Sequence, residues 1–185
     1  MRTIIKLLMK MYDHYEGTIQ IGTTDIKDIP IKQLSEHISV LSQHSYIFSS
    51  SFVDHFRWVK SDVTQVEVES ICKKVLLHDY IMSLPYGYNT IINSQMCKLS
   101  GGMSQRLAVA RVLIRNSPII IFDEIENSLD IESKEVYRKI LQDLSKDHTI
   151  IVITHNHKSL FNFDAILKVK NGELFLDNIS QTQKV

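Results

Sequence analysis

The sequence has little cysteine, no excess of charge of either sign and no long apolar run. Lys plus Arg and Asp plus Glu each number 21, so the formal net charge is zero. We therefore expect no bulk basic surface and no nucleic-acid partner. The two cysteines, Cys72 and Cys97, lack metal-ligand spacing, which favours free thiols in a reducing compartment.

No apolar run approaches the roughly 20 residues that cross a bilayer, so no transmembrane segment is predicted. At the N-terminus, Lys6 and Lys10 interrupt the apolar residues and no small-residue cleavage site follows. This pattern predicts a helix and not a signal peptide. The chain has 185 residues, of which 44% are hydrophobic, as expected of one globular domain or a domain with a lobe.

Hydrophobic periodicity predicts alternating helices and strands, without repeats or linkers. We expect helices over 3–12, 61–84, 104–115 and 131–146, strands over 18–22, 38–43, 119–122 and 148–155, and a hairpin over 165–177 that turns at Asn171-Gly172. Strand–helix–strand order in the second half predicts an α/β fold with a parallel sheet. Ligands bind such sheets beyond the carboxyl ends of the strands, where Asp123, Glu124 and His155 fall.

The two adjacent carboxylates suit two roles, because neighbours on a strand point to opposite sides. One can bind a hard cation through oxygen, and the other can accept a proton from a water molecule. The alternative is an ordinary acidic loop. His155 can bond a phosphate or simply cap its strand, and the "HNH" of 155–157 offers too few ligands for a metal site.

Ser100, Gly101 and Gly102 stand before the helix at 104–115. Glycines permit close backbone approach and a helix N-terminus offers free N–H groups, so this turn suits an anion, although it can also be a simple cap. Arg106, Arg111 and Arg115 follow on the helix. The alternative for these arginines is a solvated face, which we favour for Arg115.

In order and spacing, these elements resemble the nucleotide-binding domain of ATP-binding cassette (ABC) transporters over nearly the whole chain. "LSGGMSQR" at 99–106 resembles the signature motif, "IIIFDE" at 119–124 the Walker B strand, and "SLD" at 128–130 the D-loop. Gln43 matches the Q-loop and His155 the switch histidine. Residues 17–49 are similar to exporters, especially bacteriocin, lantibiotic and other peptide exporters.

The resemblance implies a P-loop NTPase (RecA-like) parallel-sheet core formed by 1–43 and 117–185, with a helical subdomain at 44–116. It implies ATP hydrolysis coupled to transport, with ATP and Mg²⁺ bound. Asp123 would hold Mg²⁺ through water, Glu124 would be the general base, His155 would contact the γ-phosphate, and Gln43 would touch Mg²⁺ and the attacking water.

The remaining implied roles concern partners. The signature residues would bind the nucleotide of the opposite subunit, and Asp130 would lie at the dimer interface; the signature residues are Leu99, Ser100, Gly101 and Gly102. The implied partners are a second nucleotide-binding domain, identical or not, and the transmembrane domain of an exporter. The implied location is the cytoplasmic face of the cell membrane.

Part of the family pattern is missing or altered. The nearest approach to a P-loop, G-x-x-x-x-G-K-[ST], is Gly17–Thr24, which lacks the lysine and alternates like a strand. The helix near Thr3 resembles the helix after the P-loop, so we expect the chain to begin where that loop ends. We also expect the chain alone not to bind ATP stably, and part of its core to be exposed. Met103 replaces the usual Gln of the signature, Ser94 the usual acidic residue before it, and "IEN" at 125–127 a small "ATS".

Three interpretations follow. The first is a truncated exporter ATPase domain. The second is a degenerate, non-catalytic module that supplies its signature motif to another ATPase subunit; retention of Glu124 and His155 argues against it and the missing P-loop argues for it. The third is an ABC-type ATPase of chromosome or repair proteins, which the lack of heptads between Gln43 and Leu99 disfavours.

Overall fold

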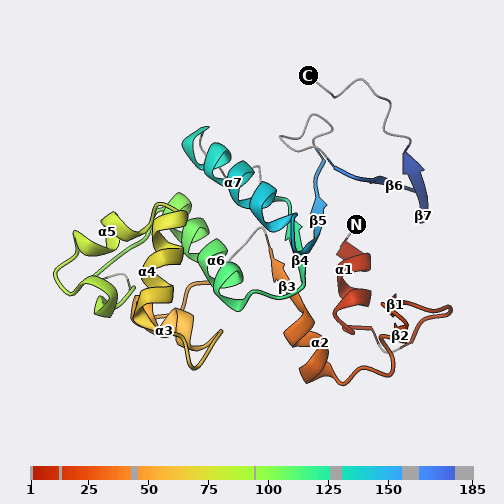
Figure 1. The fold of residues 1–185 in the computed structure, drawn as a ribbon, viewed down its shortest axis with the longest axis horizontal. Coiled ribbons are helices and arrows are strands. Elements are labelled where there is room, and N and C mark those ends of the chain that lie inside the picture. Colours follow the sequence, from red (N-terminus) through yellow and green to blue (C-terminus); the bar gives the residue numbers. More distant parts are fainter. Residues whose placement is uncertain are drawn as a thin grey trace.

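The computed structural model describes residues 2–12, 14–42, 46–93, 95–125, 131–155 and 163–177 (Figure 1). Helices and strands alternate around a parallel sheet, and a layer of helices lies to one side of it. The elements are α1 Arg2–Leu8, β1 Gln20–Ile21, β2 Thr24–Asp25, α2 Ile31–His37, β3 Ile38–Leu41, α3 Phe52–Arg57, α4 Gln65–Lys74, α5 His78–Met82, the 3-10 helix η1 Gly87–Asn89, α6 Gly101–Arg115, β4 Ile119–Asp123, α7 Ile131–Leu144, β5 Thr149–Ile153, β6 Ile166–Lys170 and β7 Glu173–Asp177.

The parallel sheet has the order β3-β4-β5, with Ile38 opposite Ile119 and Asp123 opposite Ile153. The central strand β4 is apolar throughout its middle because both of its faces are covered. Ile120 and Phe122 pack into a core with α6 and α7, whereas Ile121 packs with α1 and α2 on the other face. The predicted α/β architecture and the predicted strands at 119–122 and 148–155 are confirmed.

The bounds of the helices differ in detail from the sequence prediction. The stretch 61–84 is largely helical, as predicted, but it contains two helices, because the chain breaks at Leu76, whose φ of +53° is left-handed. α4 precedes this break, stabilised by a capping box between Thr64 and Glu67, and α5 follows it. The short helices α2 and α3 were not predicted. The first helix ends at Leu8, earlier than expected, and Lys10 is left-handed with φ +51°.

The longest helix, α6, is fixed at both ends. The Ser100 hydroxyl accepts a hydrogen bond from the Met103 backbone N–H at 3.2 Å, and Asn116 ends the helix in the left-handed conformation. Its buried face packs against both the helical layer and β4, so α6 joins the two parts of the molecule. Cys72 and Cys97 are buried free thiols, as the sequence predicts.

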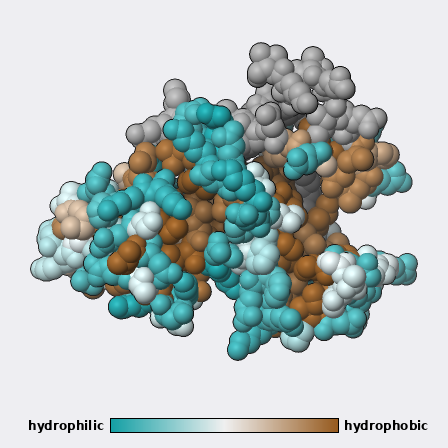
Figure 2. All heavy atoms as spheres, viewed as in Figure 1, coloured by the Kyte–Doolittle hydropathy of each residue, from teal (hydrophilic) through white to brown (hydrophobic). Residues whose placement is uncertain are grey.

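Two antiparallel hairpins complete the described chain. β1 and β2 pair across Gly22-Thr23, so the Gly17–Thr24 stretch is a hairpin and not a phosphate-binding loop between strand and helix. β6 and β7 pair across Asn171 and Gly172, both with positive φ, as predicted. One face of this second hairpin carries Leu167, Val169, Leu174 and Leu176. All four are exposed, and Figure 2 shows the apolar surface in this region.

Candidate functional site

The acidic edge, defined here as Asp123, Glu124 and His155, lies at the carboxyl ends of β4 and β5. Asp123 is the last residue of β4 and pairs with Ile153, the last residue of β5. Because the strands are parallel and in this register, the residues that follow them meet at one edge of the sheet. The sequence predicted this proximity, and the structure brings all three residues there.

Glu124 and His155 are in direct contact. His155 Nε2 lies 2.7 Å from Glu124 Oε1. The Glu124 side chain is 18% exposed and that of His155 is 70% exposed. The carboxylate is therefore largely buried, whereas the imidazole ring faces solvent. The Glu124 backbone N–H donates to the Ile153 carbonyl at 2.9 Å, which anchors the residue to β5. A carboxylate and an imidazole thus lie side by side at the surface. Such a pair can orient a water molecule or another small molecule bound next to it and take a proton from that molecule.

Asp123 is more deeply buried than Glu124: it is only 6% exposed. A carboxylate so deeply buried is costly without compensating charge or hydrogen bonds. Within the described part of the chain, no group of three or more His, Cys, Asp and Glu residues is arranged to hold a metal ion. Carboxylate oxygens are ligands for hard cations such as Mg²⁺, which keeps several of its waters and takes one or two carboxylates.

The signature turn, Leu99–Gly102, lies at the N-terminus of α6. Leu99 packs on the large core, whereas Ser100 and Gly101 are exposed. A Cβ added to Gly101 or Gly102 would meet nothing within 4 Å, and neither glycine has positive φ. The fold of this chain therefore does not require these glycines, and their absence of side chain leaves the helix N-terminus open to an approaching group.

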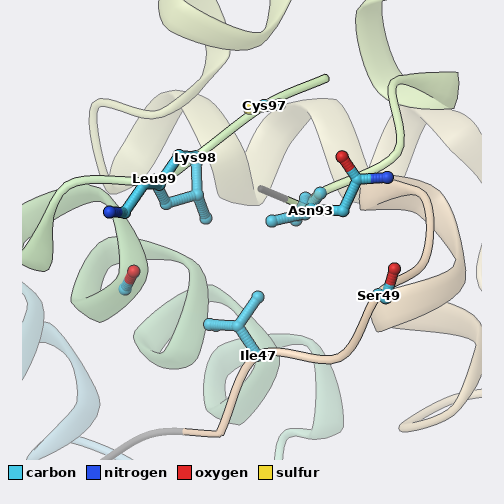
Figure 3. Close-up of a pocket in the computed structure, with 8 residues that line it drawn as sticks. Ile47, Ser49, Asn93, Cys97, Lys98 and Leu99 are labelled. Atoms are coloured by element: carbon cyan, nitrogen blue, oxygen red, sulfur yellow. The ribbon is translucent and has the colours of Figure 1, made fainter. Parts of the chain in front are cut away.

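A cavity of about 370 Å³ lies behind the signature turn. Its walls come from the segment before α3 and the loop before α6, and its lining residues are Ile47, Ser49, Ile92, Asn93, Cys97, Lys98, Leu99 and Ser104. Figure 3 shows Ile47 and Ser49 on one side and Asn93, Lys98 and Leu99 on the other. Most of the lining belongs to these two loops, and Ser104 adds the first turn of α6, so the opening is a groove between two loops and the start of a helix.

The three arginines of α6 differ in exposure: Arg106 and Arg111 are partly buried, whereas Arg115 lies on the solvated surface. Arg106 donates to the Leu76 carbonyl at 2.9 Å and to the Ser133 hydroxyl at 3.1 Å. Arg111 donates to the Tyr46 carbonyl at 3.0 Å, and burial lowers the pKa of its guanidinium. Arg115 is exposed, as predicted, and it also donates to the Ser35 carbonyl. All three tie α6 to neighbouring segments.

Gln105 belongs to the stretch that resembles the signature motif, but the sequence does not predict its buried position. It is 7% exposed, and its Nε2 donates to the Ile125 carbonyl at 3.2 Å. Ile125 directly follows Glu124. The available signal was a lone amide on a buried helix face that is otherwise apolar. Gln43, Ser94 and Asp130 lie outside the described residues.

The comparisons with known proteins agree with this geometry. Residues 2–127 match the model of the ABC transporter family. The chain is 36% identical over 172 residues to multidrug resistance protein pgp-1 of Caenorhabditis elegans, covering 93% of this chain and 13% of the relative. It is 34% identical over 172 residues to the ATP-dependent lipid A-core flippase of Saccharophagus degradans, covering 93% and 29%.

A solved structure of a bacterial Atm1-family ABC exporter with ATP bound superposes with a TM-score of 0.85 and 31% identity, covering 94% of this chain and 30% of that one. The chain thus spans between about an eighth and a third of the length of these relatives. The predicted P-loop NTPase fold class is confirmed by the family match and the superposition. The family's domains bind and hydrolyse ATP, and by this match the chain belongs to the ABC transporter family.

Proposed function

We propose that this chain is the nucleotide-binding part of an ABC exporter, in which ATP hydrolysis drives transport. One observation carries the proposal: the 2.7 Å contact between His155 and Glu124, next to buried Asp123 at the carboxyl edge of a parallel sheet. The family match and the ATP-bound exporter with the same fold support it.

Within this proposal each residue of the acidic edge has one task. Glu124 accepts the proton of the attacking water, and His155 orients both the Glu124 carboxylate and the terminal phosphate. Asp123 would hold Mg²⁺ through water, and Mg²⁺ when bound would neutralise charge on the phosphates. Phosphoryl transfer needs positioning and charge neutralisation more than covalent chemistry, which suits three polar side chains on rigid strand ends.

The signature residues act on a second nucleotide in this proposal. The free N–H groups at the start of α6 face an open approach, and Ser100, Gly101 and Gly102 would receive the γ-phosphate held by a second nucleotide-binding domain. Asp130 would lie between the two domains. Gln43 would contact Mg²⁺ and water. The 185 residues contain no G-x-x-x-x-G-K-[ST] sequence, so the phosphate cradle of a complete site is not built from them.

The transmembrane domain of the exporter is the proposed second partner. The groove between 47–49 and 92–99 is lined on both sides by loops, and exposed aromatic residues stand nearby. Phe48 packs edge-to-face against Trp58 with ring centroids 5.0 Å apart, and the Trp58 side chain is 57% exposed. Such a surface suits an apolar helix end from a membrane partner. In the described residues no helix is long and apolar enough to span a bilayer.

Two finer assignments complete the proposal. Residues 1–43 and 117–185 form the ATPase core and 44–116 the helical subdomain, consistent with the arrangement of α3–α6 beside the sheet. The exported substrate is a peptide, an assignment supported by the resemblance of 17–49 to peptide exporters. The location would be the cytoplasmic face of the membrane.

The test is Glu124→Gln in the protein isolated with its native membrane partners. We expect ATP turnover to fall at least 100-fold, because the base is lost, while ATP-driven association of the two nucleotide-binding domains persists. Glu135→Gln on α7 is the matched control, since Glu135 is exposed and pairs with neighbouring Arg138 on the same helix. Turnover in Glu124→Gln equal to that control would remove Glu124 from the mechanism.

A second candidate function is a module that lends its signature turn to another ATPase subunit, which the open N-terminus of α6 favours. In that case Glu124→Gln leaves hydrolysis intact, whereas Gly102→Asp abolishes it by placing a negative charge where the phosphate arrives. Because a Cβ at Gly102 meets nothing within the chain, the substitution leaves the fold in place. Loss of hydrolysis in both variants supports the first proposal.

A further inference from the structure

The backbone of Glu124 is held in an uncommon conformation. Its φ is +54°, in the left-handed region that residues with a Cβ rarely adopt. Such a conformation costs on the order of 1–3 kcal/mol and persists only where surrounding contacts impose it. In this conformation the Glu124 carboxylate lies against His155. The contacts that hold the backbone of Glu124 in this conformation therefore also fix the position of its carboxylate.

Two contacts hold the Glu124–Ile125 segment from opposite sides. On the sheet side, the Glu124 N–H donates to the Ile153 carbonyl at 2.9 Å. On the helix side, Gln105 Nε2 donates to the Ile125 carbonyl at 3.2 Å. The Ile125 side chain is 1% exposed, so the second contact lies in a buried environment, where a lost donor leaves the carbonyl unpaired.

Gln105 belongs to the helix that begins with the signature turn. It follows Gly101 by one helical turn, since residues four apart lie on the same face of a helix. A single buried amide therefore connects the start of α6 to the residue beside the proposed base. Tyr137 of α7 is a buried neighbour of the Gln105 side chain and touches the acidic edge in no described contact.

We propose that Gln105 is a positioning residue that holds Glu124 in its left-handed conformation and so sets the rate of hydrolysis. The inference rests on the proposed role of Glu124 as the base. Gln105 touches no reacting atom and acts only through the Ile125 carbonyl. Its loss should therefore lower the rate of the chemical step and leave nucleotide affinity nearly unchanged.

The test uses two substitutions in the protein as isolated with its partners. Gln105→Met keeps the length and the helix propensity of the side chain but removes the donor, and Gln105→Asn keeps the amide but is one methylene too short to reach. Tyr137→Phe is the matched control, because it changes a buried neighbour of Gln105 and leaves the bond to Ile125 in place.

The first readout is hydrogen exchange of backbone amides without nucleotide. We expect the Glu124 amide to exchange about five to ten times faster in both Gln105 variants, the change that loss of one hydrogen bond produces. The Ile121 amide, in the middle of β4, should change less than twofold, which separates local loosening from global destabilisation. Exchange at Glu124 that matches Tyr137→Phe overturns the proposal.

The second readout is steady-state ATP hydrolysis. We expect kcat to fall about tenfold in both Gln105 variants, with KM within twofold of the unmodified protein. An unchanged kcat despite faster exchange overturns the proposal, and so does a lower kcat with unchanged exchange at Glu124. If Glu124→Gln itself leaves turnover intact, or if the unmodified protein has none, the proposed function of Glu124 fails and this inference with it. If turnover is lost in Glu124→Gln but not in the Gln105 variants, the proposed role of Gln105 fails and that of Glu124 stands.

Discussion

The helical layer α3–α6 and the terminal hairpin β6–β7 use apolar residues in opposite ways. In the helical layer, Phe52, Phe56 and Leu107 are 0% exposed and belong to one large core. In the hairpin, the apolar face remains in contact with solvent: Leu167 is 58% exposed, Leu174 55% and Leu176 67%. Figure 2 shows apolar surface near the hairpin.

The difference shows that apolar content does not by itself measure how well a region is stabilised. Four helices can bury each other's apolar faces, whereas an isolated two-stranded hairpin has no second layer of its own and is marginal in water. The sequence pattern of β6 and β7 is as regular as that of β4, yet only β4 is enclosed on both faces. Burial therefore depends on which elements are neighbours.

The largest expected effect comes from opening the helical core. Phe56→Ala should lower the free energy of unfolding by about 3–5 kcal/mol, because it removes a fully buried ring and leaves a cavity. The matched change in the hairpin, Phe175→Ala, should lower it by less than about 1 kcal/mol, because that ring is already 47% exposed. Urea denaturation followed by circular dichroism measures both. Equal losses would contradict the comparison.

A smaller effect concerns pH and the same helical layer. Burial holds the pKa of His55 below its ordinary 6.5, and Arg111 lowers it further, while the Phe48 carbonyl and Asp54 raise it. The unfolded histidine therefore takes up a proton at higher pH than the folded one. The stability that His55 contributes is present above about pH 6.5 and is lost as pH falls through the folded pKa.

The measurement is the urea midpoint between pH 7.5 and 5 for the unmodified protein and His55→Gln. We expect the midpoint of the unmodified protein to fall more steeply below pH 6.5 than that of the variant. The hairpin contains no histidine, so its exchange rates should show no corresponding step. Parallel pH curves for the two proteins would show that His55 is not the group responsible.

The smallest effect on stability is expected for the apolar face of the hairpin. Leu174→Ser with Leu176→Ser should change the free energy of unfolding by less than about 0.5 kcal/mol, because surface substitutions remove little buried area. The same pair should reduce self-association, since exposed apolar patches promote it. Light scattering at increasing protein concentration measures the second effect. A loss of several kcal/mol would mean that this face is covered in solution.

Long, regular patterns in the sequence predicted the sheet, α6, α7 and both ends of the β6–β7 hairpin. The proximity of Asp123 and His155 was also predictable, since uninterrupted apolar strands followed by polar residues indicate a parallel sheet with one polar edge. The break at Leu76 was not, because no glycine or proline marks it and tertiary contacts impose the left-handed residue. The contact from Gln105 to Ile125 could not be predicted either, because sequence spacing does not reveal which buried backbone carbonyl needs a side-chain donor.

The order of the elements along the chain has a consequence for synthesis. β3 pairs with β4, but the whole of α3–α6 lies between them in the sequence. On the ribosome, the helices can therefore condense through nearby contacts while β3 still has no strand to pair with, because distant pairings must wait for the later segment. Asp123, Glu124 and His155 can come together only after β5 has left the exit tunnel, so we expect the signature turn to form before the acidic edge does.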